Sequence, residues 1–437
     1  MIDRFTDNMP LAQKKKVINA WAFYDWANSV YNLTITSTIF PIYWTAVTSN
    51  GGTNRVSVFG MDFLNSALYS YAISCSFLII ALLSPILSGI ADYNGTKKRF
   101  LQVFCLIGSI SCSALYFFDS SNIEYGVIAF MIGTIGWAGS LVFYNSYLPE
   151  IATEEEQDKV SARGFAFGYI GSSILLILNL IVILNPTLVG IEKGSSLPAR
   201  ISFLTVGVWW FGFAQYTFHY LPKNKHKIVI NWNILSKGYR ELANVWKELK
   251  EIKRLKLFLF SFFFYNMGVQ SVMYVAALFG SKVLHLASGQ LIATILIIQF
   301  VAIGGAYLFA YLSKRIGNIN AIIGAICCWI VICIFAYNIQ TSNQFYALAF
   351  CVGMIMGGIQ SLSRSTYSKL LPDTSDTTSY FSFYDTTEKI AIVLGTASYG
   401  IIEELTGSMR NSIFSLVGFF TIGLIVLVKN RKQITKG

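Results

Sequence analysis

Long apolar segments separated by short polar loops run along almost the whole chain of 437 residues. A helix that crosses a bilayer needs about 20 mostly apolar residues. Twelve segments are long enough: 17–47, 63–90, 100–118, 124–148, 162–184, 201–221, 257–283, 289–312, 321–339, 345–370, 380–402 and 412–428. The pattern predicts an all-α membrane protein with twelve transmembrane helices.

One stretch, 223–256, interrupts this pattern. It holds ten Lys and Arg residues against three Glu residues. Its apolar residues recur at steps of three and four, at Leu235, Tyr239, Leu242, Trp246, Leu249 and Ile252. This spacing predicts an amphipathic helix, either on the membrane surface or as a solvated linker. The stretch divides the chain into two six-helix halves, 1–222 and 257–437.

The low fraction of charged residues indicates a membrane protein, and the distribution of Lys and Arg predicts its orientation. Only 13% of the residues are charged, against about 25% in soluble proteins, and 54% are hydrophobic. Most of the 33 Lys and Arg residues fall in loops on one side if both termini are cytoplasmic, as the positive-inside rule requires. We therefore expect a multi-pass protein of the cytoplasmic membrane with both termini inside. The net charge of +11 comes from separate clusters, which argues against nucleic-acid binding.

The loop between the second and third segments, SGIADYNGTKKR at 88–99, carries a specific pattern. Its charged and turn residues are Asp92, Gly95, Lys97, Lys98 and Arg99. It resembles the loop between helices 2 and 3 of major facilitator superfamily transporters, G-x-L-A-D-x-x-G-x-K, with Ser88 and Tyr93 as departures. The resemblance implies two six-helix halves around a central substrate site, with this loop as a gate and Asp92 as a latch of the outward-open state. The matching loop at 310–317 has Lys314 in place of Asp92.

Four further segments narrow the resemblance. They are AWAFYDWAN at 20–28, YLPEIA at 147–152, GGIQSLSRS at 357–365, and YFSFYD at 380–385 followed by Lys389. Together they resemble the bacterial Unknown Major Facilitator family, which is similar to the autophagy-related vacuolar amino-acid effluxers of fungi. The resemblance implies a monomeric, cofactor-free secondary transporter that moves a small polar solute by alternating access. Amino acids or related metabolites are the implied solutes.

Five charged residues lie inside predicted membrane helices: Asp25, Arg364, Asp385, Glu388 and Lys389. A charge at the bilayer centre costs about 2.5–3.5 kcal/mol, so such residues usually face a cavity or a partner. Asp25 and Arg364 fall on the first and tenth segments, which line the cavity in the superfamily. They form either a gate that breaks during transport or a static pair.

On the eleventh segment, Asp385 and Lys389 share one helix face because they are four residues apart. We expect Lys389 to bind a substrate carboxylate or to tune a neighbouring carboxylate; the alternative is neutralisation within the helix. Asp25, Asp385 and Glu388 are candidates for proton coupling, because a low dielectric favours the neutral carboxyl. The expected polar lining is Tyr24, Asn28, Asn32, Tyr144, Asn145, Asn266, Gln270 and Gln360.

Enzymatic chemistry has little support in the sequence. The three histidines lie at helix ends or in the basic stretch, without metal-ligand spacing, and the seven cysteines lie within apolar segments. A Walker A sequence is absent. We expect no catalytic residue, metal or cofactor. A membrane-embedded lipid-modifying enzyme and a non-transporting sensor are the alternatives.

Overall fold

The computed structural model describes residues 5–6, 9–49, 55–222 and 232–435. The chain starts with α1 (Leu11–Val30), the π-helical turn η1 (Tyr31–Thr36) and α2 (Ile39–Thr48). An antiparallel hairpin follows, β1 (Arg55–Val58) and β2 (Met61–Leu64), with Arg55 opposite Leu64. The sequence did not predict this hairpin, which is short and runs into the start of the predicted segment 63–90.

The other helices follow one another with short loops. The first set is α3 (Asn65–Asn94), α4 (Lys97–Ala114), η2 (Leu115–Phe117), α5 (Ile123–Asn145), α6 (Leu148–Ile151), α7 (Glu154–Leu184), η3 (Pro186–Val189) and α8 (Leu197–Tyr220). The second set is α9 (Trp232–Glu251), α10 (Lys253–Leu284), α11 (Ser288–Ile316), α12 (Asn318–Asn338), α13 (Ser342–Leu370), α14 (Thr377–Thr406) and α15 (Met409–Thr435). Local signals set some of these ends. Gly95 ends α3 in the left-handed conformation, at φ 60°, which glycine adopts without steric cost.

The prediction of an all-α membrane protein is confirmed, because ten helices in the described part of the chain are long and apolar enough to cross a membrane. Two predicted segments are outside this set. Segment 17–47 is divided among α1, η1 and α2, and α14 carries the three charged residues predicted for 380–402. The count of twelve membrane helices therefore stays a prediction.

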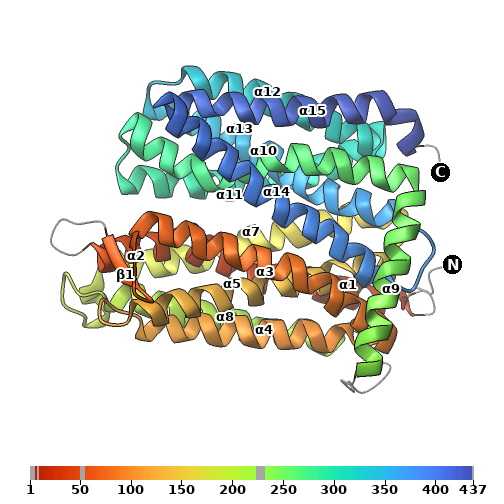
Figure 1. The fold of residues 1–437 in the computed structure, drawn as a ribbon, viewed down its shortest axis with the longest axis horizontal. Helices are drawn as coiled ribbons and strands as arrows, with labels where there is room; N and C mark the ends of the chain where they lie inside the picture. The colour runs from red at the N-terminus through yellow and green to blue at the C-terminus, as the bar shows by residue number, and fades with distance from the viewer. Residues whose placement is uncertain (1–4, 7–8, 50–54, 223–231, 436–437) are drawn as a thin grey trace.

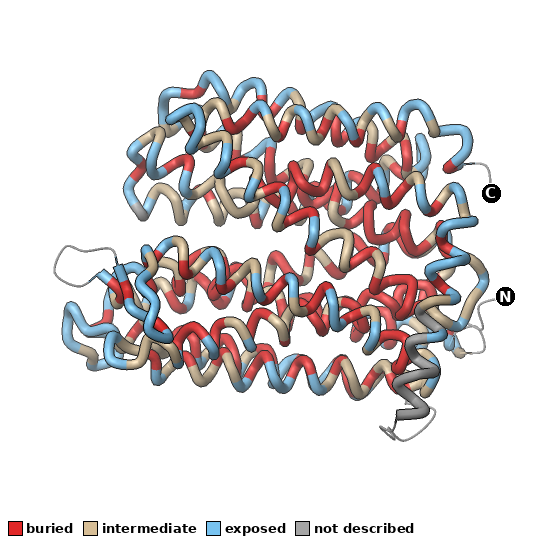
Figure 2. The backbone as a smooth tube through the Cα atoms, in the orientation of Figure 1, coloured by how far each residue is buried: buried red, intermediate tan, exposed pale blue. Residues whose placement is uncertain are grey.

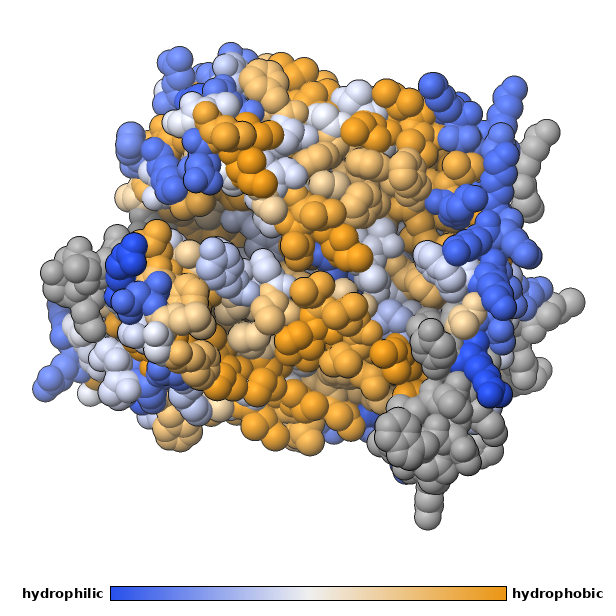
Figure 3. Space-filling model, viewed as in Figure 1, coloured by the Kyte–Doolittle hydropathy of each residue, from blue (hydrophilic) through white to orange (hydrophobic). Residues whose placement is uncertain are grey.

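The buried hydrophobic side chains form two large clusters. One extends from Val17 to Leu221 and the other from Val245 to Ile434, with only Ile392 and Tyr169 placed in the cluster of the other half. We call α1–α8 the first bundle and α10–α15 the second bundle; Figure 1 shows one above the other. The buried parts of the backbone lie mostly in the interior of the two bundles, and the exposed parts lie mostly at the ends and on the outside (Figure 2). The sides of the two bundles are largely apolar on the face shown in Figure 3, as expected of a surface in contact with lipid.

The two ends of the bundles differ. Both chain termini and α9 lie at one end, which we call the terminal end, and the β1–β2 hairpin lies at the other, the hairpin end (Figure 1). The predicted helix of the linker is present as α9, which packs against α3. Glu248 of α9 accepts a hydrogen bond from Tyr380 of α14 at 2.8 Å, and the rings of Trp246 and Phe383 lie 5.3 Å apart. Residues 223–231 and the side chains of Leu235, Tyr239 and Leu242 lie outside the described residues, and the position of α9 on a membrane surface stays a prediction.

Candidate functional site

A cavity of about 1240 Å³ lies between the two bundles. The surface is hollowed between them toward the hairpin end (Figure 3). Ten of the predicted substrate and coupling residues line the cavity: Asp25, Asn28, Asn32, Asn145, Asn266, Gln270, Gln360, Arg364, Glu388 and Lys389. They come from α1, η1, α5, α10, α13 and α14, so both bundles contribute.

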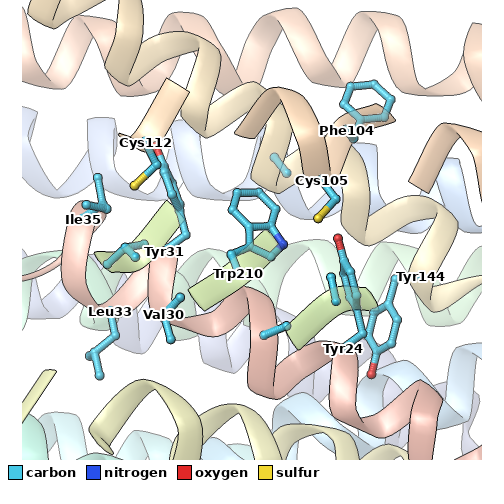
Figure 4. Packing of buried hydrophobic residues seen from close by; sticks show 14 of the residues in the cluster. Tyr24, Val30, Tyr31, Leu33, Ile35, Phe104, Cys105, Cys112, Tyr144 and Trp210 are labelled. Atoms are coloured by element: carbon cyan, nitrogen blue, oxygen red, sulfur yellow. The ribbon is translucent and has the colours of Figure 1, made fainter. Parts of the chain in front are cut away.

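Three predicted residues are placed elsewhere. Tyr24 is fully buried in the first bundle, where its ring packs 5.1 Å from that of Tyr144 (Figure 4). Tyr144 lies behind the cavity wall, where its hydroxyl donates a hydrogen bond to Asp25 at 2.8 Å. Asp385 is buried to 1% exposure under Lys389. Both tyrosines are on the helices that the sequence assigned to the lining, but helix rotation turns them into the core.

Asp25 and Arg364 form an ion pair across the two bundles. Arg364 Nη1 lies 3.2 Å from Asp25 Oδ2, and the guanidinium also donates to the side chain of Asn145 and to the hydroxyl and carbonyl of Ser161. The guanidinium carbon lies 4.2 Å from the ring centre of Phe165. Arg364 is 3% exposed, and a charge so buried is tolerated only when paired and hydrogen-bonded.

Gly164 on α7 makes room for this pair. A Cβ atom at that position would lie 2.6 Å from Asp25 Oδ2 and 2.8 Å from Arg364 Nη2. Both distances are shorter than real Cβ contacts. Sequence reasoning missed Gly164, because one glycine in an apolar segment carries no signal of what it faces.

The charges of α14 form a second cluster. Lys389 Nζ lies 2.8 Å from Asp385 Oδ1 and 3.6 Å from Glu388 Oε2. Glu388 Oε1 accepts a hydrogen bond from Gln270 of α10 at 2.9 Å. The side chain of Glu388 is 22% exposed, whereas those of Lys389 and Asp385 are 2% and 1% exposed. Glu388 is thus the member of this cluster that is most exposed to the cavity.

The predicted gating loop lies against the start of α14. Asp92 accepts the backbone N–H groups of Ser379 at 2.6 Å and of Thr378 at 3.3 Å. A carboxylate at a helix N-terminus is stabilised by the unpaired N–H groups and the helix dipole. Lys97 forms an ion pair with Glu150 and donates to Thr377 Oγ1 at 2.8 Å, whereas Lys98 donates to the carbonyl of Leu221 within its own bundle.

The matching interface at α11 and α12 has its own carboxylate, which comparison of the two loops missed. Lys314 is exposed. Asp158, at the start of α7, instead accepts hydrogen bonds from Ser313 at 2.8 Å and Asn318 at 2.7 Å, and lies 2.7 Å from Lys369 Nζ. The carboxylate therefore comes from the first bundle in both interfaces, from the last turn of α3 in one and from α7 in the other.

In the described part of the chain, the hydrogen bonds and ion pairs between the bundles are confined to one part of the interface. Among the described residues, the hydrogen bond farthest from the terminal end on α14 joins the hydroxyl of Thr386 to the carbonyl of Ala81 at 3.2 Å. On α7 it joins Tyr169 to Gln360 at 2.7 Å. The bundles are therefore closed together at the terminal end, and the cavity lies on the hairpin side of the contacts.

Aromatic side chains are the main part of the lining that sequence reasoning missed. They are Trp137, Phe165, Tyr169, Phe262, Tyr274 and Tyr384, and Tyr265 is a seventh ring of the lining. The chain has 67 aromatic residues (Phe, Tyr and Trp). Residue type alone therefore does not separate cavity rings from core rings.

The family described as "Vacuole effluxer Atg22 like" matches residues 13–434, nearly the whole chain. The chain belongs to this Atg22-like family. The Atg22-like chain is 32% identical over 433 residues to "Uncharacterized MFS-type transporter YxiO" of Bacillus subtilis strain 168, covering 98% of this chain and 95% of that protein. It is 25% identical to "Autophagy-related protein 22" of Saccharomyces cerevisiae strain S288c, covering 86% of this chain and 79% of that protein.

Solved structures share the fold of this Atg22-like protein. The major facilitator transporter FucP in its outward conformation matches with a TM-score of 0.68 at 12% identity, covering 95% of this chain and 98% of FucP. The proton:xylose symporter XylE matches with a TM-score of 0.72 at 13% identity, covering 97% of this chain and 96% of XylE. The expectation of a major facilitator fold, and of a transporter similar to the Atg22 effluxers, is confirmed.

Proposed function

We propose that this Atg22-like protein is a secondary active transporter that exports a small polar solute across the cytoplasmic membrane by alternating access. The observation that carries the proposal is the cavity between the bundles, lined by Asp25, Arg364, Glu388 and Lys389 and closed at one end only. Buried charges inside a membrane protein usually mark a substrate or ion pathway. The names of the relatives support export, and amino acids or related metabolites are the proposed solutes.

Orientation follows from the distribution of Lys and Arg. Loop 88–99 and the described part of the basic linker lie at the terminal end. By the positive-inside rule, this end faces the cytoplasm. The conformation is then open to the outside, and the two bundles are the proposed rocking units.

Under the proposed alternating access, the Asp25–Arg364 pair acts as a gate and not as a static pair. The pair joins α1 to α13 on the closed side of the cavity. Opening the terminal end separates these helices, so the pair must break in each cycle. Proton uptake by Asp25 or Glu388 would weaken the cation–carboxylate contacts and so couple the motion to a proton gradient.

Uptake into proteoliposomes tests the proposal. Vesicles containing the purified protein are exposed to a bacterial metabolite extract under a pH gradient, and captured solutes are identified by mass spectrometry. We expect at least one polar metabolite to accumulate, to stop accumulating when a protonophore collapses the gradient, and to be lost with D25N and E388Q. E404Q is the matched control, because Glu404 is exposed on the same helix as Glu388 but outside the cavity.

Two results would count against parts of the proposal. Accumulation that survives the protonophore, with D25N and E388Q fully active, would rule out proton coupling. If no metabolite accumulates in vesicles of correctly folded protein, the transport proposal itself fails.

A further inference from the structure

The charges, rings and amides of the cavity also indicate the chemical class of the solute. We propose that the Glu388 carboxylate is the counter-ion for a protonated amine of the solute, and that the solute carries no net negative charge. This inference rests on the proposed transport function and narrows its substrate class. It reverses the expectation that Lys389 binds a substrate carboxylate.

The two cations of the cavity are already neutralised by carboxylates. Arg364 is paired with Asp25, and its other donors reach Asn145 and Ser161. Lys389 lies between Asp385 and Glu388. A solute carboxylate would have to displace one of these buried partners and leave it without its cation, which is costly in a low dielectric.

Three carboxylates face two cations in and beneath the cavity, so one negative charge is in excess. The excess falls on Glu388, because Asp25 and Asp385 have the shorter contacts to the cations. Glu388 is also the most exposed of these side chains. An ammonium group in the cavity can therefore contact the Glu388 carboxylate, whose negative charge is not fully balanced by a neighbouring cation.

The aromatic lining also favours a positively charged solute. Seven rings line the cavity, and Tyr274 and Tyr384 are among them. The face of an aromatic ring attracts a cation, by about 0.5–1 kcal/mol at exposed sites and more when the cation is desolvated. An anionic solute would gain nothing from the same faces.

Buried amides without hydrogen-bond partners are an independent sign that the cavity can bind a polar ligand. Asn28 and Asn266 each have an Nδ2 group, and Gln299 an Oε1 atom, without a hydrogen-bond partner among the described residues. Their exposures are 1%, 4% and 7%, and all three line this cavity. Buried polar atoms are usually hydrogen-bonded, so a solute with polar groups besides its amine would complete them.

Three compounds that share one ring test the charge preference. Tyramine carries the amine, tyrosine carries both charges, and 3-(4-hydroxyphenyl)propionate carries the carboxylate alone. Each is added to the purified full-length protein in lipid nanodiscs, and the shift in unfolding temperature gives its binding. We expect tyramine to stabilise the protein most, tyrosine less, and the propionate not at all.

The variant E388Q should weaken tyramine binding by about tenfold or more, because a charge-assisted contact is lost, whereas E404Q should bind as the wild type does. Binding of the propionate equal to that of tyramine, full binding by E388Q, or no binding of any of the three compounds would overturn the inference. The outcomes separate the two proposals. Transport of anions alone refutes the amine inference, whereas tyramine binding without movement of any metabolite refutes the transport function.

Discussion

Arg364 shows how a single residue connects the parts of this molecule. It lies on α13 of the second bundle, yet its guanidinium contacts Asp25 on α1, Asn145 on α5 and Ser161 on α7. A planar guanidinium can serve several acceptors in fixed directions, which a lysine ammonium on a flexible stem cannot match. The side chain is therefore suited to hold three helices of the first bundle in one conformation.

Gly164 gives a test of this arrangement at a position that carries no charge. In G164A the added methyl group displaces Asp25 or Arg364, so we expect the ion pair to be broken and transport to fall by about tenfold or more, as for loss of a buried pair. The matched control is G212A on α8, where an added Cβ has no neighbour within 4 Å. Proteoliposome transport and the unfolding temperature are measured for both variants; equal transport by G164A and G212A would contradict the gating role.

The sequence was informative about the charged residues of the site and much less so about its neutral ones. Asp25, Arg364 and Lys389 could be identified because a charge in an apolar segment demands a partner. Gly164 and the aromatic lining could not, because glycine and aromatic residues are common in membrane helices and their direction depends on helix rotation.

Pairs of elements at the terminal end carry the contacts that close it. In one interface α3 presents Asp92 to the start of α14, and in the other α7 presents Asp158 to α11 and α12. The loop pattern identified the first interface. The second was missed because its carboxylate lies on α7, far in sequence from the loop that it contacts.

We expect the two interfaces to loosen separately. D92N removes the charge at the start of α14, and D158N removes it at the start of α12. Each variant should lose about 1 kcal/mol of stabilising free energy at its interface. Amide exchange should then become about fivefold faster at the helix start that the variant contacts and stay unchanged at the other helix start. Hydrogen–deuterium exchange of peptides covering 377–386 and 312–321 measures this.

D119N is the control for the exchange experiment, because Asp119 caps a turn between η2 and α5 and has no contact with the second bundle among the described contacts. It should change neither peptide. Exchange that rises equally in both peptides for each variant would show that the two interfaces are a single unit.

At the scale of the whole molecule, the membrane class and the family were predictable, and the conformation was not. Hydrophobic segments of about 20 residues fix the class, since lipid requires every backbone group to be paired inside a helix. The same sequence folds into both states of a transporter, so only the three-dimensional contacts reveal which end is closed. The break of segment 17–47 at η1 also depends on packing that a hydrophobic pattern does not record.

The account depends most on the terminal end opening during transport, and a reversible cross-link tests this directly. Ser146 in the first bundle and Thr378 in the second have hydroxyl oxygens 3.4 Å apart, so cysteines at both positions can form a disulfide. The native cysteines are replaced first. Asn179 and Thr205, whose side chains lie 3.0 Å apart within the first bundle, provide the matched control pair.

Metabolite transport by the oxidised S146C/T378C protein is the decisive measurement. We predict that oxidation stops transport, that a reductant restores it, and that the N179C/T205C protein transports equally well in both states. Full transport by the cross-linked S146C/T378C protein would contradict alternating access between the two bundles.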